Sequence, residues 1–171
     1  GHSITFLPGV ANRHSLDAVF VEGTIASRLV DNELGEKFIP TGLPKHINIA
    51  EQASGTRSSH EQRMLLIGTQ SFDNRYRTGL IIDVVPSVLE ATNWTIVLKL
   101  HPGESADFYE ELLRSIGYDP SDHDRISVAT DDLYGYIHRA DLLLTVNSNV
   151  GIESIILGTP AVCYNPWVPS K

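Results

Sequence analysis

The chain has 171 residues, of which 42% are hydrophobic and 20% are charged, so it holds enough apolar material for a buried core. Thirteen basic and 21 acidic residues give a formal net charge of −8, and the basic residues form no cluster. These values argue against nucleic acid and against an anionic membrane surface as the main partner. They leave room for a nucleotide, which needs only a local anion site.

The sequence contains no apolar run near the roughly 18 residues that span a membrane, and no stretch typical of a signal-peptide h-region. The single cysteine, Cys163, excludes an internal disulfide and suits a reducing, cytoplasmic compartment. Its apolar neighbours favour a buried structural thiol over a nucleophile. Residues 1–3 look like a tag scar and no initiator methionine is present, so we expect a piece of a longer protein.

The first predicted elements form a lead-in segment over residues 4–44. Short buried strands are predicted over 17–23 and 37–44, with a helix over 24–34 between them, which together indicate a small βαβ-like unit. Residues 45–63 are polar and lack periodicity, so they are predicted to be a linker.

Beyond the linker, apolar strands alternate with helices. Strands are predicted over 63–70, 94–100, 124–130, 141–146 and 160–165, and helices over 78–92, 105–117, 131–140 and 149–158. Pro86 either kinks the first of these helices or marks its start. Apolar strands that alternate with helices predict a parallel sheet covered on both faces. The predicted fold class is α/β, an open, doubly wound, Rossmann-like sheet of about five strands. It occupies residues 64–171 and is expected to be truncated at its C-terminus.

Ligands of such sheets bind beyond the carboxyl ends of the strands, in the loops that enter the helices. Four loops of this chain have that position, over residues 68–79, 101–105, 129–132 and 147–151. They are rich in glycine and in small polar residues, which favours a binding role for this edge of the sheet.

The last of these loops contains Asn147, Ser148 and Asn149 at the predicted start of a helix. With Ser148 as N-cap, the amides of the next three residues would lie at the positive end of the helix dipole, where an anion binds well. Gly151 would let the backbone approach a ligand closely. Plain helix capping, without a ligand, is the alternative.

Glu153 lies further along the same predicted helix. The isoleucines Ile152, Ile155 and Ile156 follow the spacing of a core-facing stripe, which would place Glu153 on another face. A carboxylate near the strand ends could accept hydrogen bonds from ribose hydroxyls, or could simply interact favourably with the helix dipole.

His101 ends a predicted strand and precedes Pro102, which favours an extended backbone. Its imidazole is therefore predicted to project toward the ligand side, where it could meet a phosphate or a leaving-group oxygen. A surface histidine without a ligand is the alternative.

Thr69 and Gln70 directly follow another predicted strand and are candidate donor-binding residues. Arg75 and Arg77 come next and would suit a phosphate, although a solvated loop needs no ligand. The other histidines show no spacing typical of a metal site, so no metal is expected. The dinucleotide, P-loop and nucleophile-elbow motifs are absent.

The loops together resemble the nucleotide-sugar (donor) domain of GT-B glycosyltransferases, in particular bacterial capsular polysaccharide glycosyltransferases and CDP-glycerol glycerophosphotransferases. The shared pattern is a His-Pro pair after a buried strand, then Leu-Tyr, Ala-Asp, a serine turn, an acid and a proline. The matching positions are His101-Pro102, Leu133-Tyr134, Ala140-Asp141, Ser148, Glu153 and Gly158-Thr159-Pro160. The likeness covers residues 17–165, with its specific motifs in 97–165.

The resemblance implies that His101 and the helix start at Ser148 contact the donor's phosphates, and that Glu153 holds the ribose. It implies transfer from a nucleotide-activated sugar or CDP-glycerol without a bound metal or cofactor, in capsule or surface polysaccharide biosynthesis. It also implies a cytoplasmic enzyme, and it allows association of the full-length protein with the inner membrane.

The chain departs from the family pattern in two respects. Glycerophosphotransferases carry a Trp-His-Gly motif ahead of this region, and its histidine is thought to be the base, whereas the corresponding residues 7–13 include no histidine. The acceptor-binding half is also missing from this chain. We therefore expect the isolated chain to bind a nucleotide but to be inactive alone.

Two alternatives remain open. A non-hydrolysing UDP-sugar 2-epimerase shares the fold, but usually has Gly-Gly after the serine and consecutive carboxylates in the helix. Asn149-Val150 and Glu153-Ser154 match neither feature. The other alternative is a non-catalytic binding or interaction module on the same scaffold, which the fold does not exclude.

Overall fold

The computed structural model describes residues 19–21, 38–40, 46, 48–49, 62–71, 74–146 and 148–164. By its internal contacts the chain divides into two compact units, Gly1–Glu51 and Gln52–Lys171. Each unit contains its own sheet.

The first unit contains a parallel pair of short strands, β1 (Val19–Val21) and β2 (Phe38–Pro40), in which Val19 lies opposite Phe38. Both strands were predicted. The helix predicted over 24–34 lies outside the described residues.

Part of the predicted linker, residues 45–63, is folded instead. His46 and residues 48–49 are helical, and Ile49 is buried. The surrounding residues are polar and no window there shows a helical period, so the sequence did not indicate this short helical stretch.

The second unit contains a five-stranded sheet and four helices. Their bounds are β3 (Met64–Gly68), α3 (Asn74–Ala91), β4 (Thr95–Lys99), α4 (Ala106–Ser115), β5 (Ile126–Ala129), α5 (Leu133–Arg139), β6 (Leu142–Thr145), α6 (Val150–Ile156) and β7 (Ala161–Cys163). The strand order is β5-β4-β3-β6-β7 and every pair is parallel. The predicted doubly wound, Rossmann-like α/β fold is confirmed.

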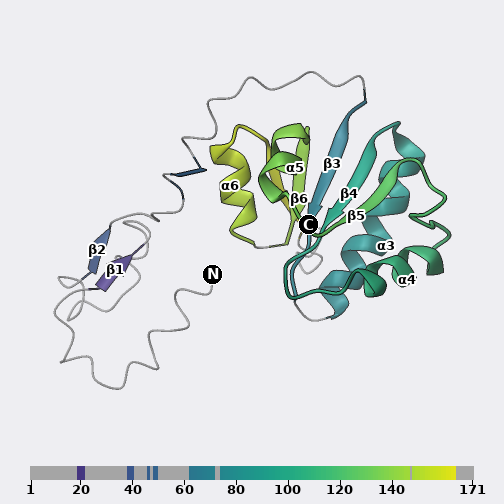
Figure 1. The fold of residues 1–171 in the computed structure, drawn as a ribbon, viewed down its shortest axis with the longest axis horizontal. Helices are drawn as coiled ribbons and strands as arrows, with labels where there is room; N and C mark the ends of the chain where they lie inside the picture. Colours follow the sequence, from purple (N-terminus) through teal and green to yellow (C-terminus); the bar gives the residue numbers. More distant parts are fainter. Residues whose placement is uncertain are drawn as a thin grey trace, which may run out of the picture. The chain divides into compact units, whose positions relative to one another are not determined.

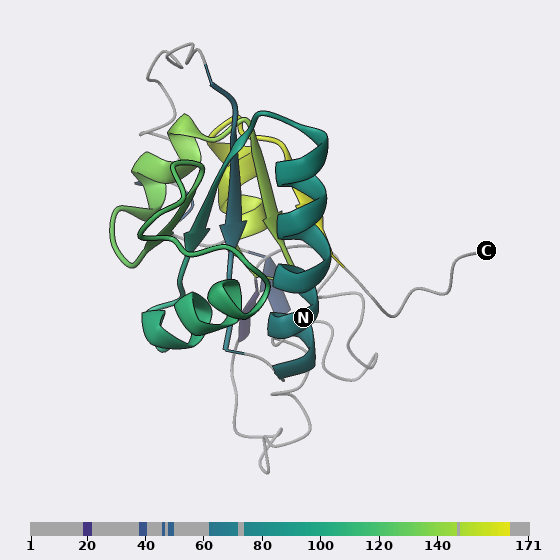
Figure 2. The ribbon, with the colours of Figure 1, turned by 90° about the vertical axis from the view of Figure 1, so that its right-hand side faces the viewer.

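The direction of the chain through the sheet determines which helix covers which face. From β3 the chain moves outward through β4 to β5, then crosses back to β6 and continues to β7. With right-handed crossovers, α3 and α4 lie on one face and α5 and α6 on the other. Figures 1 and 2 show this arrangement around the central strand β3.

The hydrophobic core cluster lies between the sheet and helices α3 and α4. Leu65 and Ile67 of β3 pack there with Ile81 of α3 and Leu113 of α4. Since side chains alternate along a strand, the fully buried Leu66 faces the side covered by α5 and α6. Both faces of β3 are therefore buried, as its continuously apolar sequence predicted.

Helix α3 begins four residues before the predicted start at residue 78, and Pro86 lies inside it. The added turn has no apolar period, so no sequence pattern indicated it. It is supported by tertiary contacts instead, since the guanidinium of Arg77 lies 4.0 Å from the centre of the Phe108 ring.

Helix α6 has a different buried face from the predicted one. Ile152 and Ile155 are 47% and 64% exposed, whereas Glu153 is 4% exposed and Ser154 is fully buried. The buried stripe is Val150, Glu153, Ser154 and Leu157, which has helical spacing but mixes polar with apolar residues. The predicted helical spacing of the buried residues is right, but the predicted buried face of the helix is wrong.

This burial predicts the stability of two variants of α6. Ile155→Ser should change the free energy of unfolding by less than about 0.5 kcal/mol, because the side chain is mostly in water and serine has a similar helix propensity. Leu157→Ala should cost about 3 kcal/mol because it leaves a cavity. Urea unfolding of the two variants measures both values. A larger loss of unfolding free energy for Ile155→Ser than for Leu157→Ala would support the predicted orientation, with Ile155 on the buried face.

Cys163 was expected to be buried and is exposed. It ends β7, the outermost strand on that side of the described sheet, and the other two residues of the strand are also partly or fully exposed. An apolar sequence does not ensure burial at a sheet edge, because an edge strand of the described sheet has only one neighbouring strand.

Candidate functional site

The strand order of the second unit reverses between β3 and β6, which is where ligands of doubly wound sheets bind. Thr69 and Gln70 follow β3, and Ser148 and Asn149 lie between β6 and α6. His101 follows β4, the other neighbour of β3. Three of the four predicted loops therefore extend from adjacent strands, while the fourth follows the edge strand β5. Asn147 lies outside the described residues.

The two strands at this reversal lie close together. Thr145 Oγ1 donates a hydrogen bond of 3.0 Å to the carbonyl oxygen of Gly68. A Cβ atom on Gly68 would lie only 3.0 Å from Cγ1 of Val150, so a larger residue there would push against the first turn of α6. Gly68 therefore lets the start of α6 approach the end of β3.

The start of α6 differs from the prediction. Asn149, rather than Ser148, occupies the N-cap position, and its side chain makes no capping hydrogen bond. Ser148 Oγ accepts from the amide of Val150 at 3.3 Å, and the Ser148 carbonyl accepts from the amide of Gly151 at 3.0 Å. Two of the three amides that were expected to face an anion are therefore used within the turn.

Gly151 and Glu153 lie on the buried face of α6. A Cβ atom on Gly151 would meet Thr145 at an ordinary contact distance of 3.5 Å, so this glycine packs against β6. Burial of the Glu153 side chain leaves little of its surface for a ribose, in contrast to the predicted open position.

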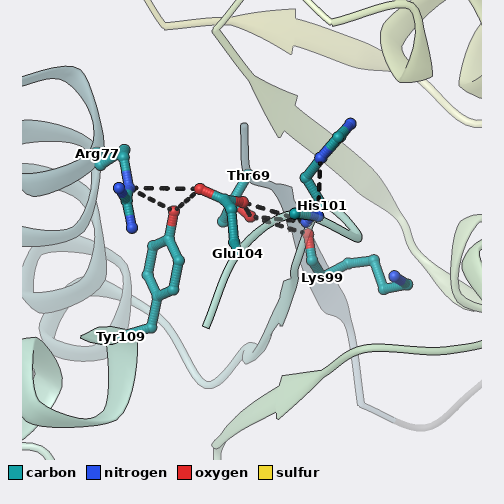
Figure 3. A network of polar contacts seen from close by, with 7 residues as sticks. Thr69, Arg77, Lys99, His101, Glu104 and Tyr109 are labelled. Carbon is teal, nitrogen blue, oxygen red and sulfur yellow. Dashed lines mark hydrogen bonds and ion pairs between the residues drawn. The ribbon is translucent and has the colours of Figure 1, made fainter. Parts of the chain in front are cut away.

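His101 is exposed, with its imidazole directed away from the neighbouring polar network (Figure 3). Its Nδ1 accepts a hydrogen bond of 3.2 Å from the amide of Gly103. A neutral imidazole with this contact carries its proton on Nε2, which can then donate to a ligand. The adjacent Pro102 is also exposed.

Glu104 forms a buried network that the sequence did not predict (Figure 3). Its side chain is only 1% exposed. One carboxylate oxygen, Oε2, accepts from Thr69 Oγ1 and from the His101 amide at 3.1 Å. The other, Oε1, accepts from the Tyr109 hydroxyl at 2.6 Å and lies 3.3 Å from Arg77 Nε. Arg77, which was considered for a phosphate, is thus paired with a carboxylate.

A small hollow lies beside this network, at the junction of β3, α3, α4 and the end of β6. It is open to solvent and measures about 220 Å³ with that solvent counted, and it is lined by Thr69, Gln70, Tyr76, Arg77, Leu80, Tyr109 and Val146. The Oε1 atom of Gln70 is buried without a hydrogen-bond partner. The predicted Thr69 and Gln70 thus contribute to one concavity at the strand ends.

Lys99 is a second buried charge that the sequence did not single out. Its Nζ donates to the carbonyl oxygens of Leu100 at 2.9 Å and Thr130 at 3.0 Å. Burial lowers the pKa of this lysine, and the nearby Asp131 carboxylate partly opposes that shift. Lys99 thereby connects the loops that follow β4 and β5.

Within the described ranges, no cluster of three or more histidine, cysteine or acidic side chains could hold a metal ion. Among the helices of those same ranges, none has the length and apolar character needed to cross a membrane.

No protein-family model matches the chain, and a search of curated proteins found no match. Solved structures do match its fold. The co-structure of S. aureus MnaA with UDP has a TM-score of 0.64 and 14% identity, over 88% of this chain and 42% of that one. A putative UDP-N-acetylglucosamine 2-epimerase from Listeria monocytogenes has a TM-score of 0.61 and 16% identity, over 89% and 43%.

The wall teichoic acid polymerase TagF, in a variant crystal soaked with CDPG, has a TM-score of 0.51 and 14% identity, over 86% of this chain and 38% of that one. The chain thus spans about two fifths of the length of the structures it resembles. At such identities the likeness shows the fold alone. The chain has a Rossmann-like α/β fold of the kind found in GT-B proteins, which these epimerase and polymerase structures share.

Proposed function

We propose that the second unit binds the nucleotide of an activated donor, as the donor domain of a glycosyltransferase or glycerophosphotransferase in bacterial capsule or surface polysaccharide biosynthesis. The reversal of strand order between β3 and β6 is the observation that supports this most directly. It brings the polar residues Thr69, Gln70 and Ser148 to one edge of the sheet, with His101 just after the neighbouring strand β4.

In this proposal His101 donates from Nε2 to a phosphate oxygen, because Nδ1 is already engaged with the amide of Gly103. Charge that develops on the departing nucleotide would be stabilised by this donor. Ser148 and Asn149, which follow β6 across the strand reversal, would contribute polar groups to the donor in this proposal, and Asn147 is proposed as a further contact. Glu153 has the weakest support in its ribose role, because it is buried.

In this proposal, catalysis requires more than this chain. We propose that the acceptor-binding half of the same protein contributes the base, that the full-length enzyme works in the cytoplasm or at the inner face of the membrane, and that no cofactor is needed. The isolated chain would then bind nucleotide without transferring a group.

Thermal unfolding with nucleotide tests the proposal. We expect CMP, CDP or UDP at about 1 mM to raise the Tm, because a ligand that binds only the folded state stabilises it by RT ln(1 + [L]/Kd), about 2.7 kcal/mol at 100 times Kd. No shift with any of the three would contradict the proposal and favour an interaction module.

The site residues are tested in the same assay. His101→Ala and Ser148→Ala should each weaken nucleotide binding by about tenfold, the loss of one charge-assisted contact. His138→Ala is the matched control, because α5 leads into the amino end of β6, at the opposite edge of the sheet. Equal nucleotide affinities for all three variants would show that His101 and Ser148 do not contribute to the site.

An epimerase is the second candidate, since two of the solved structures named as UDP-N-acetylglucosamine 2-epimerases have TM-scores of 0.61 and 0.53 against 0.51 for TagF. The departures at Asn149-Val150 and Glu153-Ser154 count against it. A clear preference for CDP over UDP would favour the glycerophosphotransferase over the epimerase.

A further inference from the structure

Glu104 is a carboxylate with almost no contact with water, which is costly unless every oxygen lone pair finds a donor. Its two oxygens meet this requirement separately. Oε1 is held by Tyr109 and Arg77, and Oε2 is held by Thr69 and the His101 amide. The carboxylate is therefore held by partners from α3, from α4 and from the loops that follow β3 and β4.

The two pairs of partners have different roles. Tyr109 belongs to α4 and is a fully buried member of the hydrophobic cluster, and Arg77 belongs to α3 and lies over the ring of Phe108, which packs against that cluster. Thr69 and His101 belong to the loops that follow the adjacent strands β3 and β4. Oε1 thus anchors Glu104 to the packed helices, while Oε2 holds the two loops that contribute candidate ligand contacts.

Thr69 strengthens this connection. Its hydroxyl also lies 3.3 Å from the His101 amide, and its own amide donates to the carbonyl of Lys99 at 3.1 Å. The His101 amide thus has two acceptors within reach, Glu104 Oε2 and Thr69 Oγ1, and the Thr69 hydroxyl is itself hydrogen-bonded to Glu104. The amide of Glu104 in turn donates to the His101 carbonyl at 2.9 Å.

We propose that Glu104 is a positioning residue that holds His101 and Thr69 in place for a phosphate before the ligand arrives. It does not touch the ligand, because its side chain is buried. The ligand part of this inference rests on the proposed function. Preorganised groups bind more tightly, since less freedom is lost when the ligand binds.

The variant Glu104→Gln tests the proposal without a ligand. Its amide keeps one acceptor oxygen but places an NH₂ group against existing donors, so one side of the network must open. We expect amide hydrogen exchange at His101 and Glu104 to accelerate at least tenfold. The amide of Leu98, inside β4, should keep its wild-type protection.

Glu110→Gln is the matched control, because Glu110 lies in α4, which begins just after Glu104, and makes a surface ion pair of 3.0 Å with Arg114. It should leave exchange at His101 unchanged. If Glu104→Gln does not fold, Thr69→Val removes the hydroxyl that joins Glu104 to His101 and should accelerate the same amides. Unchanged exchange at His101, or a uniform increase that includes Leu98, would overturn the proposal.

Nucleotide binding supplies the second measurement. Glu104→Gln should raise the Kd for CDP or UDP about tenfold, with less than a twofold change for Glu110→Gln. If the wild-type chain binds no nucleotide, the proposed function fails, while the exchange rates still decide whether Glu104 positions the loop. If the wild type binds and Glu104→Gln binds equally well, the positioning role fails and the proposed function stands.

Discussion

Ile81→Ala is expected to lower the free energy of unfolding of the second unit by about 3 kcal/mol, whereas Ile82→Ala should change it by less than about 1 kcal/mol. The two isoleucines are neighbours in α3, but Ile81 is fully buried in the main cluster and Ile82 is 43% exposed. Removing the buried side chain loses its transfer free energy and leaves a cavity.

The pair controls for helix propensity, because both substitutions replace isoleucine by alanine inside the same helix. Urea unfolding followed by circular dichroism measures both values. A domain has only about 5–15 kcal/mol of stability, so the loss at Ile81 should move the midpoint visibly. Equal losses at the two positions would mean that α3 is rotated about its axis relative to the structure.

The strands show what the sequence can predict. Each is an apolar run of about the right length, and both faces of the central strands are buried, so alternation with helices was enough to predict a parallel, doubly wound sheet. The same rule placed the loops after β3, β4 and β6 at one edge, which is why residues from three predicted loops meet at adjacent strands.

Helix α6 shows where the pattern misleads. Its buried stripe contains Glu153 and Ser154, and its exposed face contains Ile152 and Ile155. Hydrophobicity alone assigns these faces the other way round. The small residues Gly151 and Ser154 face the interior, and such positions are specified by the space available, which a single sequence does not reveal.

The Glu104 network could not be predicted for a different reason. Glu104 lies just before a predicted helix, where an acid is adequately explained by the helix dipole. The sequence therefore did not single it out. Its partners Thr69 and Arg77 are 35 and 27 residues away in the chain and meet it only in the folded protein. No local spacing carries that information.

Tyr109→Phe is expected to reduce stability in a way that depends on pH. At neutral pH the variant loses the hydroxyl contact with Glu104, which should cost about 1–3 kcal/mol. In the wild type, burial raises the pKa of Tyr109 from its ordinary 10.0 to about 12, and the hydrogen bond to Glu104 adds to the shift while Arg77 opposes it.

The raised pKa sets the sign of the effect. Between pH 10.0 and about 12 the unfolded chain has lost the Tyr109 proton and the folded protein still holds it. Stability therefore falls as pH rises through this window, by about 1.4 kcal/mol per pH unit for this one group. Below the window the contribution of the tyrosine is fully present, and phenylalanine has no such dependence.

The measurement is the difference in unfolding free energy between wild type and Tyr109→Phe from about pH 8 to about pH 11. Tyr164, whose pKa burial and Asp83 raise to about 12, and Lys99, whose pKa burial lowers, also make stability depend on pH. Both are present in the two proteins, so their contributions cancel in the difference. We expect a constant difference below about pH 9.5 and a steady decrease above it. A difference that stays constant to pH 11 would show that the Tyr109 hydroxyl titrates normally and that the network around Glu104 is open to water.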